Sequence, residues 1–135
     1  TRDTIMTEQD SRRPGQSAIG FGRIAAMLPV RDMDRACAFY EGLLGFTRTF
    51  ENGQPAGFVI LKKDAAELHL TLQKEHEAAR FTVAHMLVDD VDALHALCRA
   101  QGLRIVKGLK DQEYRLRAFV FEDPDGNRID VGQRL

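Results

Sequence analysis

Several side chains that can bind a small molecule fall in segments predicted to be β-strands. The candidates are aromatic residues for an apolar lining and polar residues that could anchor a ligand: Phe58, Tyr114 and Phe119, with His69, His85, Arg117 and Asp130. Small-molecule sites combine such a lining with a few convergent polar groups. Side chains alternate between the two faces of a strand, so Glu67 shares a face with His69 and is a further candidate. For each residue the alternative is an ordinary place in the core or on the surface.

Signatures of other chemistries are missing from the sequence. Gly20-Phe21-Gly22 is isolated and does not make a phosphate-binding loop. The only two cysteines, Cys37 and Cys98, lack the spacing of zinc ligands. Each falls in a predicted helix, where burial as a small apolar residue is expected rather than a disulfide. The sequence therefore offers no nucleophile triad, phosphate loop or zinc finger.

The elements that position the candidates occur twice. The segment 30–46 recurs at 88–103, and each copy has a strand end, a capping aspartate, a helical pattern and a glycine that ends the helix. Asp32 corresponds to Asp90, and Gly45 corresponds to Gly102 with one residue fewer in between. Similarity on this scale indicates a repeated supersecondary unit. A ligand would then lie between the two copies.

Each copy predicts the element order βαβββ. The first copy predicts a strand over 24–30, a helix from Asp32 to Gly45, and strands over 47–51, 57–62 and 67–73. The second predicts a strand over 81–88, a helix over 90–101, strands over 104–107, 115–121 and 128–132, and a tight turn at 124–127. The fold class is therefore α+β, with modules over about 23–75 and 80–133.

Composition predicts one domain of an ordinary globular class. The chain has 135 residues, 44% hydrophobic residues and a net charge of −1, with no excess of charge for nucleic acid. No apolar run reaches the roughly 18 residues of a membrane span, and no signal arrangement opens the chain. We therefore expect a cytoplasmic protein without nucleic-acid or membrane partners. Residues 1–20, poor in apolar side chains, predict a flexible tail before a domain over 21–135.

Five short segments carry a family resemblance. They are Pro29-Val30-Arg31-Asp32, Ala38-Phe39-Tyr40, Leu44-Gly45-Phe46, Val88-Asp89-Asp90-Val91-Asp92 and Phe121-Glu122-Asp123-Pro124-Asp125-Gly126-Asn127. Because of these segments, the chain resembles the vicinal oxygen chelate superfamily over about residues 23–133. This superfamily includes glyoxalases, extradiol dioxygenases, fosfomycin resistance enzymes and bleomycin resistance proteins. The resemblance implies two βαβββ modules whose sheets curl into a cup, usually in a homodimer.

Enzymes of that superfamily hold a divalent metal at four cup-facing positions, and the resemblance assigns these to Ala25, His69, Val83 and Asp130. Ala25 and Val83 have no ligand atoms, whereas a transition metal needs at least three protein ligands. The expectation is therefore no bound cofactor. The alternative is a displaced site for zinc, iron, nickel or manganese, formed by His69, His85 and Asp130. Against this alternative, His85 lies two residues beyond Val83, and such a shift along a strand moves a ligand atom by about 6 to 7 Å, several times the length of a metal–ligand bond.

Without a metal, the chain is most similar to bleomycin resistance proteins, which bind a drug and perform no chemistry. Tyr114 occupies a position at which that branch often has Trp, and this chain contains no Trp. Residues 104–117 carry five Lys or Arg against two acids, which does not favour a flat cationic drug such as bleomycin.

The resulting prediction is a binding protein that sequesters a planar aromatic or glycopeptide-like compound, as in antibiotic resistance. The alternatives are a metal-dependent enzyme, either a lactoylglutathione lyase-like or a dioxygenase-like one with unassigned catalytic residues, and a relic without a ligand. We expect a homodimer that places His69 opposite Asp130 across the twofold axis. The competing arrangement is a monomer whose two modules close on each other.

Overall fold

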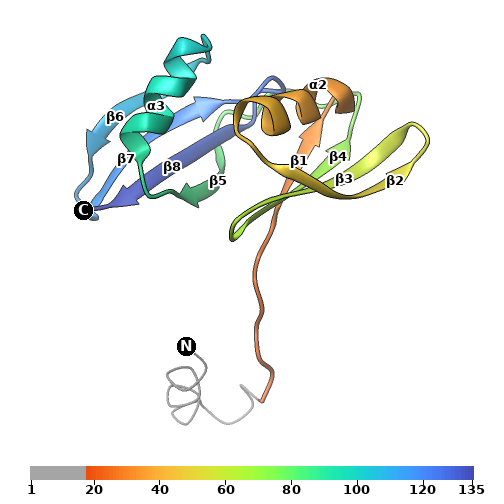
Figure 1. Cartoon of the computed structure of the whole chain (residues 1–135), viewed down its shortest axis with the longest axis horizontal. Helices are drawn as coiled ribbons and strands as arrows, with labels where there is room; N and C mark the ends of the chain where they lie inside the picture. Colours follow the sequence, from red (N-terminus) through yellow and green to blue (C-terminus); the bar gives the residue numbers. More distant parts are fainter. Residues whose placement is uncertain (1–17) are drawn as a thin grey trace.

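The computed structural model describes residues 18–135, which form two four-stranded sheets, one from each predicted module. The sheets lie next to each other along the long axis of the molecule (Figure 1). Their strand orders are β1-β4-β3-β2 and β5-β8-β7-β6. In each sheet the first strand pairs in parallel with the last strand of the same module, and the other pairs are antiparallel. The predicted fold class and the repeated order are thereby confirmed.

The elements have the following bounds. The first module consists of β1 (Ala26–Val30), α2 (Met33–Cys37), η1 (Ala38–Leu43), β2 (Thr47–Gly53), β3 (Ala56–Lys63) and β4 (Ala66–Leu72). The second consists of β5 (Thr82–Leu87), α3 (Val91–Ala100), β6 (Ile105–Asp111), β7 (Leu116–Glu122) and β8 (Arg128–Arg134). The predicted tail, residues 1–20, falls almost entirely outside the described residues. Within the part of the chain that is described, no helix is long and apolar enough to cross a bilayer.

Both helical segments begin at an aspartate that caps the first turn. The carboxylate of Asp32 accepts a 3.0 Å hydrogen bond from the backbone N–H of Arg35, and that of Asp90 accepts one of 3.0 Å from Ala93. Such a cap contributes about 1 kcal/mol. The segments are followed by Gly45 and Gly102, whose φ angles of 81° and 72° are left-handed, as the sequence predicts.

The first helical segment differs from the continuous helix that the sequence predicted. After Cys37, α2 passes into η1, which is π-helical. A π-helical turn bonds residues i and i+5 and so holds one residue more than an α-helical turn. This accounts for the extra residue between Asp32 and Gly45 compared with the second copy.

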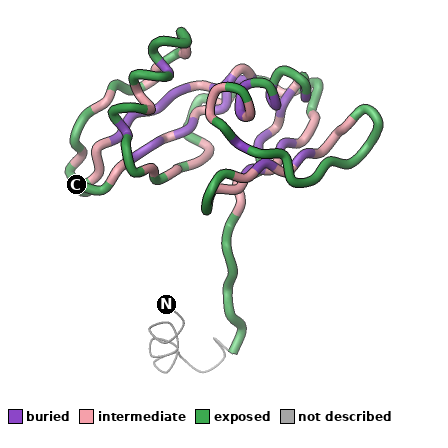
Figure 2. The backbone as a smooth tube through the Cα atoms, viewed as in Figure 1, coloured by how far each residue is buried: buried purple, intermediate pink, exposed green. Residues whose placement is uncertain are grey.

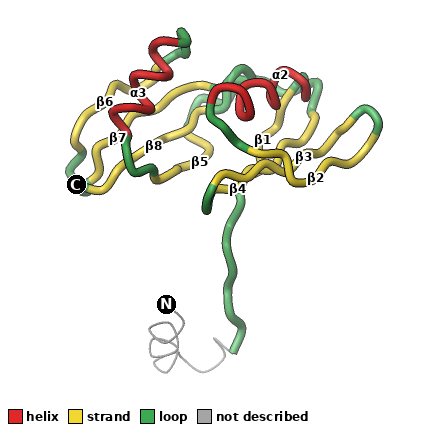
Figure 3. The backbone as a smooth tube through the Cα atoms, in the orientation of Figure 1, coloured by secondary structure: helices red, strands yellow, loops and turns green. Residues whose placement is uncertain are grey.

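The hydrophobic core lies between the sheets and the helices, which cover one side of the molecule (Figure 3). Buried stretches follow the central strands (Figure 2). Alternate residues of β4 and β7 face the helices, and among them Leu70, Phe119 and Phe121 are at most 1% exposed. Full burial of such a side chain contributes about 1.5 to 3 kcal/mol. No helix of the described residues covers the opposite face of either sheet (Figure 3).

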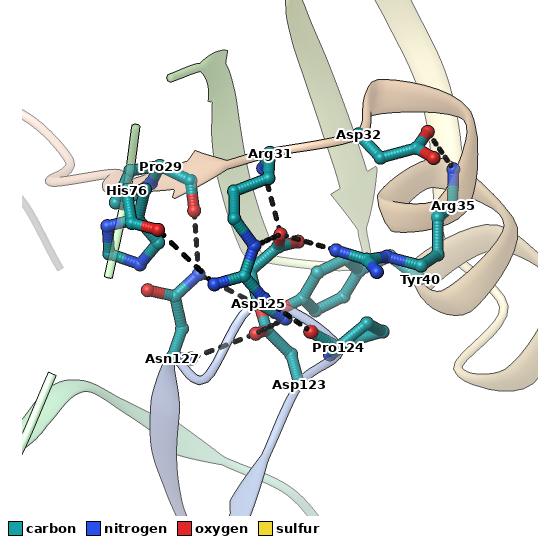
Figure 4. A network of polar contacts seen from close by, with 10 residues as sticks. All are labelled: Pro29, Arg31, Asp32, Arg35, Tyr40, His76, Asp123, Pro124, Asp125 and Asn127. Carbon is teal, nitrogen blue, oxygen red and sulfur yellow. Dashed lines mark hydrogen bonds and ion pairs between the residues drawn. The ribbon is translucent and has the colours of Figure 1, made fainter. Parts of the chain in front are cut away.

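A turn of the second module holds the first module in place (Figure 4). Asp125 is fully buried, and its Oδ1 accepts hydrogen bonds of 2.8 Å from the backbone N–H of Arg31 and from the Arg35 guanidinium. Asn127 donates a 3.0 Å bond to the carbonyl of Pro29. The turn at 124–127, predicted from sequence, is therefore also the joint between the modules.

The same joint contains a buried tyrosine. The Tyr40 hydroxyl donates a 2.7 Å hydrogen bond to Oδ2 of Asp123, and the two side chains are 1% and 5% exposed. Burial, together with the negative charge of Asp123 and this bond, raises the pKa of Tyr40 well above its ordinary value. The motif residues at this joint thus contribute stability and lie apart from the open sheet faces.

Candidate ligand-binding site

The open face of the second sheet carries a hollow of about 590 Å³. Its floor includes Ala118 and Val120 of β7, themselves only 1% and 4% exposed, whose side chains alternate with those of Phe119 and Phe121 on the helix side. Tyr114, 60% exposed in the turn before β7, stands at its side. The hollow therefore combines an apolar floor with an accessible aromatic ring, which suits a flat ligand.

A histidine and a carboxylate are paired in this hollow. His85 on β5 and Asp130 on β8 are register partners, and His85 Nδ1 lies 2.5 Å from Asp130 Oδ2. An ionised carboxylate only accepts hydrogen bonds, so His85 Nδ1 is the donor to an ionised Asp130. Gly132 lies beside the ring, and a Cβ there would be in ordinary van der Waals contact with Cε1 of His85. The pair thus presents an oriented polar group.

A second pair occupies the open face of the first sheet. His69 Nε2 lies 2.7 Å from Oε2 of Glu67, which confirms that these two residues share a face. Arg23 approaches the other carboxylate oxygen at 2.5 Å, and Lys62 at 4.0 Å. The hydrogen bond from His69, followed by the charge of Arg23, lowers the pKa of Glu67. The Phe58 ring meets His69 edge-on at a centroid distance of 5.5 Å.

Two predicted lining residues lie on the other side of their sheet. The Phe119 ring is 1% exposed and packs against His95 of α3 at 5.0 Å, although the residue borders the hollow. Arg117 Nε donates a 2.8 Å bond to Asp92 of α3. Both face the helix because odd-numbered residues of β7 alternate with the floor residues. The expectation that Phe119 and Arg117 present their side chains to a ligand is therefore corrected.

Seven residues that line the hollow were not named as candidates from the sequence, and two of them are lysines. Lys107 and Lys110 of β6 border the hollow, together with Gln112. The basic excess over 104–117 was a signal for the two lysines, but a strand predicted to end at Lys107 gave no reason to place Lys110. In the structure β6 continues to Asp111.

The displaced metal set is not assembled within one chain. His69 lies on the first sheet, whereas His85 and Asp130 lie on the second. Among residues 18–135, no group of three or more His, Cys, Asp or Glu side chains could hold a metal ion. The donor set of a single chain thus does not fit the divalent metal of the superfamily's enzymes.

Comparison with known proteins assigns the fold to a family. The sequence model of the Glyoxalase/Bleomycin resistance protein/Dioxygenase superfamily matches residues 20–131. The chain belongs to this superfamily. An uncharacterized protein of Mycolicibacterium smegmatis is 33% identical over 103 residues, which cover 76% of this chain and 85% of that protein. The resemblance noted in the sequence is confirmed.

Solved structures of two proteins that bind antibiotics have a similar fold. A bleomycin-binding protein complexed with bleomycin has a TM-score of 0.71 and 26% identity, over 85% of this chain and all 100% of that one. TnmS3, an antibiotic-binding protein from Streptomyces sp. CB03234, has a TM-score of 0.68 and 25% identity, over 89% of this chain and 100% of that one.

Proposed function

We propose that this protein binds a planar aromatic small molecule in the hollow of its second sheet and holds it without chemical conversion. The observation that carries the proposal is a hollow of about 590 Å³ in which an apolar floor adjoins the paired His85 and Asp130. Tyr114 supplies a ring against which a flat ligand can stack. The similarity to a bleomycin-binding protein and to an antibiotic-binding protein supports a role in sequestration.

We further propose that the binding unit is a cytoplasmic homodimer. The open face of the first sheet exposes Met27 (61%) and Phe50 (50%), and β5 exposes Leu87 (46%). Phe119, which the sequence analysis counted among the apolar residues of the cup, is buried against α3 and does not contribute. In an isologous dimer, the first sheet of one chain would cover the hollow of the other and add the aromatic pair Phe50 and Phe58. His69 of one chain would then lie opposite Asp130 of the other.

The test is a thermal-shift screen of planar aromatic and heteroaromatic compounds. A ligand at a hundredfold excess over its Kd stabilises a protein by about 2.7 kcal/mol, which raises Tm by several degrees. We expect Tyr114→Ala and His85→Ala, both in the lining of the hollow, to weaken the binding of a hit. Leu97→Ala, on the helix side, serves as the control. If both site variants bind the hit as tightly as the parent, the hollow is not the binding site.

A further inference from the structure

We propose that the ligand of the hollow is an anion, a planar aromatic compound that carries a carboxylate or a similarly acidic group. This inference rests on the proposed function and specifies the class of its ligand. It follows from the charges that line the hollow. Lys107 and Lys110 both border it and are exposed, and neither forms an ion pair within 4.0 Å with any residue of the range 18–135.

The negative charge in the lining is already engaged. Asp130 is the one carboxylate that lines the hollow within the described part of the chain, and His85 occupies one of its oxygens at 2.5 Å. Asp111, next to Lys110 in the sequence, bonds instead to Arg117 at 3.1 Å. The two ammonium groups are thus left to attract an anion.

The geometry of β6 brings both lysines to the same face. Residues three apart on a regular strand point to opposite faces. In β6, however, Lys107 is paired with Val120 and Lys110 with Ala118, so three steps on β6 correspond to two on β7. This register shift is a β-bulge with one extra residue, which re-aims a side chain. Directly paired residues share a face, and Val120 and Ala118 form the floor of the hollow.

Two neighbouring arginines differ from these lysines because their guanidinium groups have carboxylate partners. Arg117 bonds to Asp92 and Asp111 on the helix side of the sheet. Arg104 lies 3.4 Å from Glu122. Among the described residues, Lys107 and Lys110 are the two Lys or Arg side chains that line the hollow itself. In the proposed dimer, the first sheet of the partner chain covers the hollow. The carboxylate of Glu67 on that sheet is paired with Arg23 and Lys62, so it would not neutralise the two lysines.

The test compares three compounds of one shape: 2-naphthoate, neutral 2-naphthamide and cationic 2-naphthamidine. Each is titrated into the ¹⁵N-labelled protein and followed by NMR. We expect 2-naphthoate to bind about tenfold more tightly than the amide, since a charge-assisted hydrogen bond is worth at least this factor. The preference should shrink as salt is added. Shifts should map to β6, β7 and Tyr114.

The variant Lys107→Gln/Lys110→Gln should remove the preference for 2-naphthoate over 2-naphthamide. Lys74→Gln/Arg99→Gln removes the same charge at exposed positions outside the hollow and should keep the preference. Circular dichroism and Tm establish that both variants are folded. Equal binding of the three compounds, or a preference that survives in the lysine variant, overturns the anion inference and leaves the binding function standing. Binding of none of them, together with an empty thermal-shift screen, overturns both.

Discussion

Replacing Tyr40 by Phe removes one oxygen atom from the buried joint between the two modules. That hydroxyl donates a 2.7 Å hydrogen bond to Asp123, and the ring stays in place because Phe has the same shape. A hydrogen bond to a charged group contributes about 1.5 to 3 kcal/mol. Asp123 keeps bonds from the backbone N–H groups of Asp125 and Asn127, so its carboxylate remains partly satisfied. We therefore expect Tyr40→Phe to lower the free energy of unfolding by about 2 kcal/mol.

The assay is urea unfolding followed by circular dichroism, with Tyr114→Phe as the matched control. Tyr114 is the other tyrosine of the chain and is 60% exposed, so its loss of a hydroxyl should change the free energy by less than about 0.5 kcal/mol. A loss of 2 kcal/mol corresponds to roughly 6 to 10 °C in Tm. Equal stabilities of the two variants would refute the account of the joint.

Tyr40 also gives this prediction a pH dependence. Its pKa in the folded protein is raised above the ordinary value of 10.0. A raised pKa contributes stability that is fully present below the unfolded value and is lost as pH rises towards the folded value. The parent should therefore lose stability above pH 10, and Tyr40→Phe should lose less over the same range. Identical slopes for the two proteins would contradict the assignment.

Three further predictions concern composition, assembly and the turn of the joint. Protein purified without chelator should carry less than one divalent ion per chain by elemental mass spectrometry; a stoichiometric metal that is lost in His69→Ala and Asp130→Ala would revive the enzyme alternative. Light scattering should give the mass of two chains of 15.2 kDa, and the mass of one would reject the dimer. If the dimer forms, mixing His69→Ala with Asp130→Ala chains should restore some binding, whereas sites confined to one chain would show no rescue. Gly126→Ala should lower the free energy of unfolding by about 2 kcal/mol or more, because the φ of Gly126 is 79° and an added Cβ would clash with that of Ala78. An unchanged urea midpoint would refute this prediction.

The repeated architecture could be predicted because its signals are local. Capping aspartates, glycines at helix ends and strand alternation each act over a few residues, and Asp32, Gly45 and the pair of Glu67 and His69 lie as these rules predict.

The orientation of β7 could not be predicted in the same way. Which face of that strand meets α3 is decided by tertiary packing, so Phe119 and Arg117 were expected in the hollow and lie on the helix side. The bulges of β6 depend on pairing with β7. The strand predicted over 104–107 continues through Gly108 to Asp111 in the structure.

The most direct test of the binding function is a crystal structure of the protein with a hit from the thermal-shift screen. The account predicts that the compound lies on Ala118 and Val120, stacks against Tyr114, and contacts His85 or Asp130. A compound found instead in the apolar groove of about 710 Å³ beside Phe46, Leu87 and Leu94, with the hollow of the second sheet unoccupied, would contradict it.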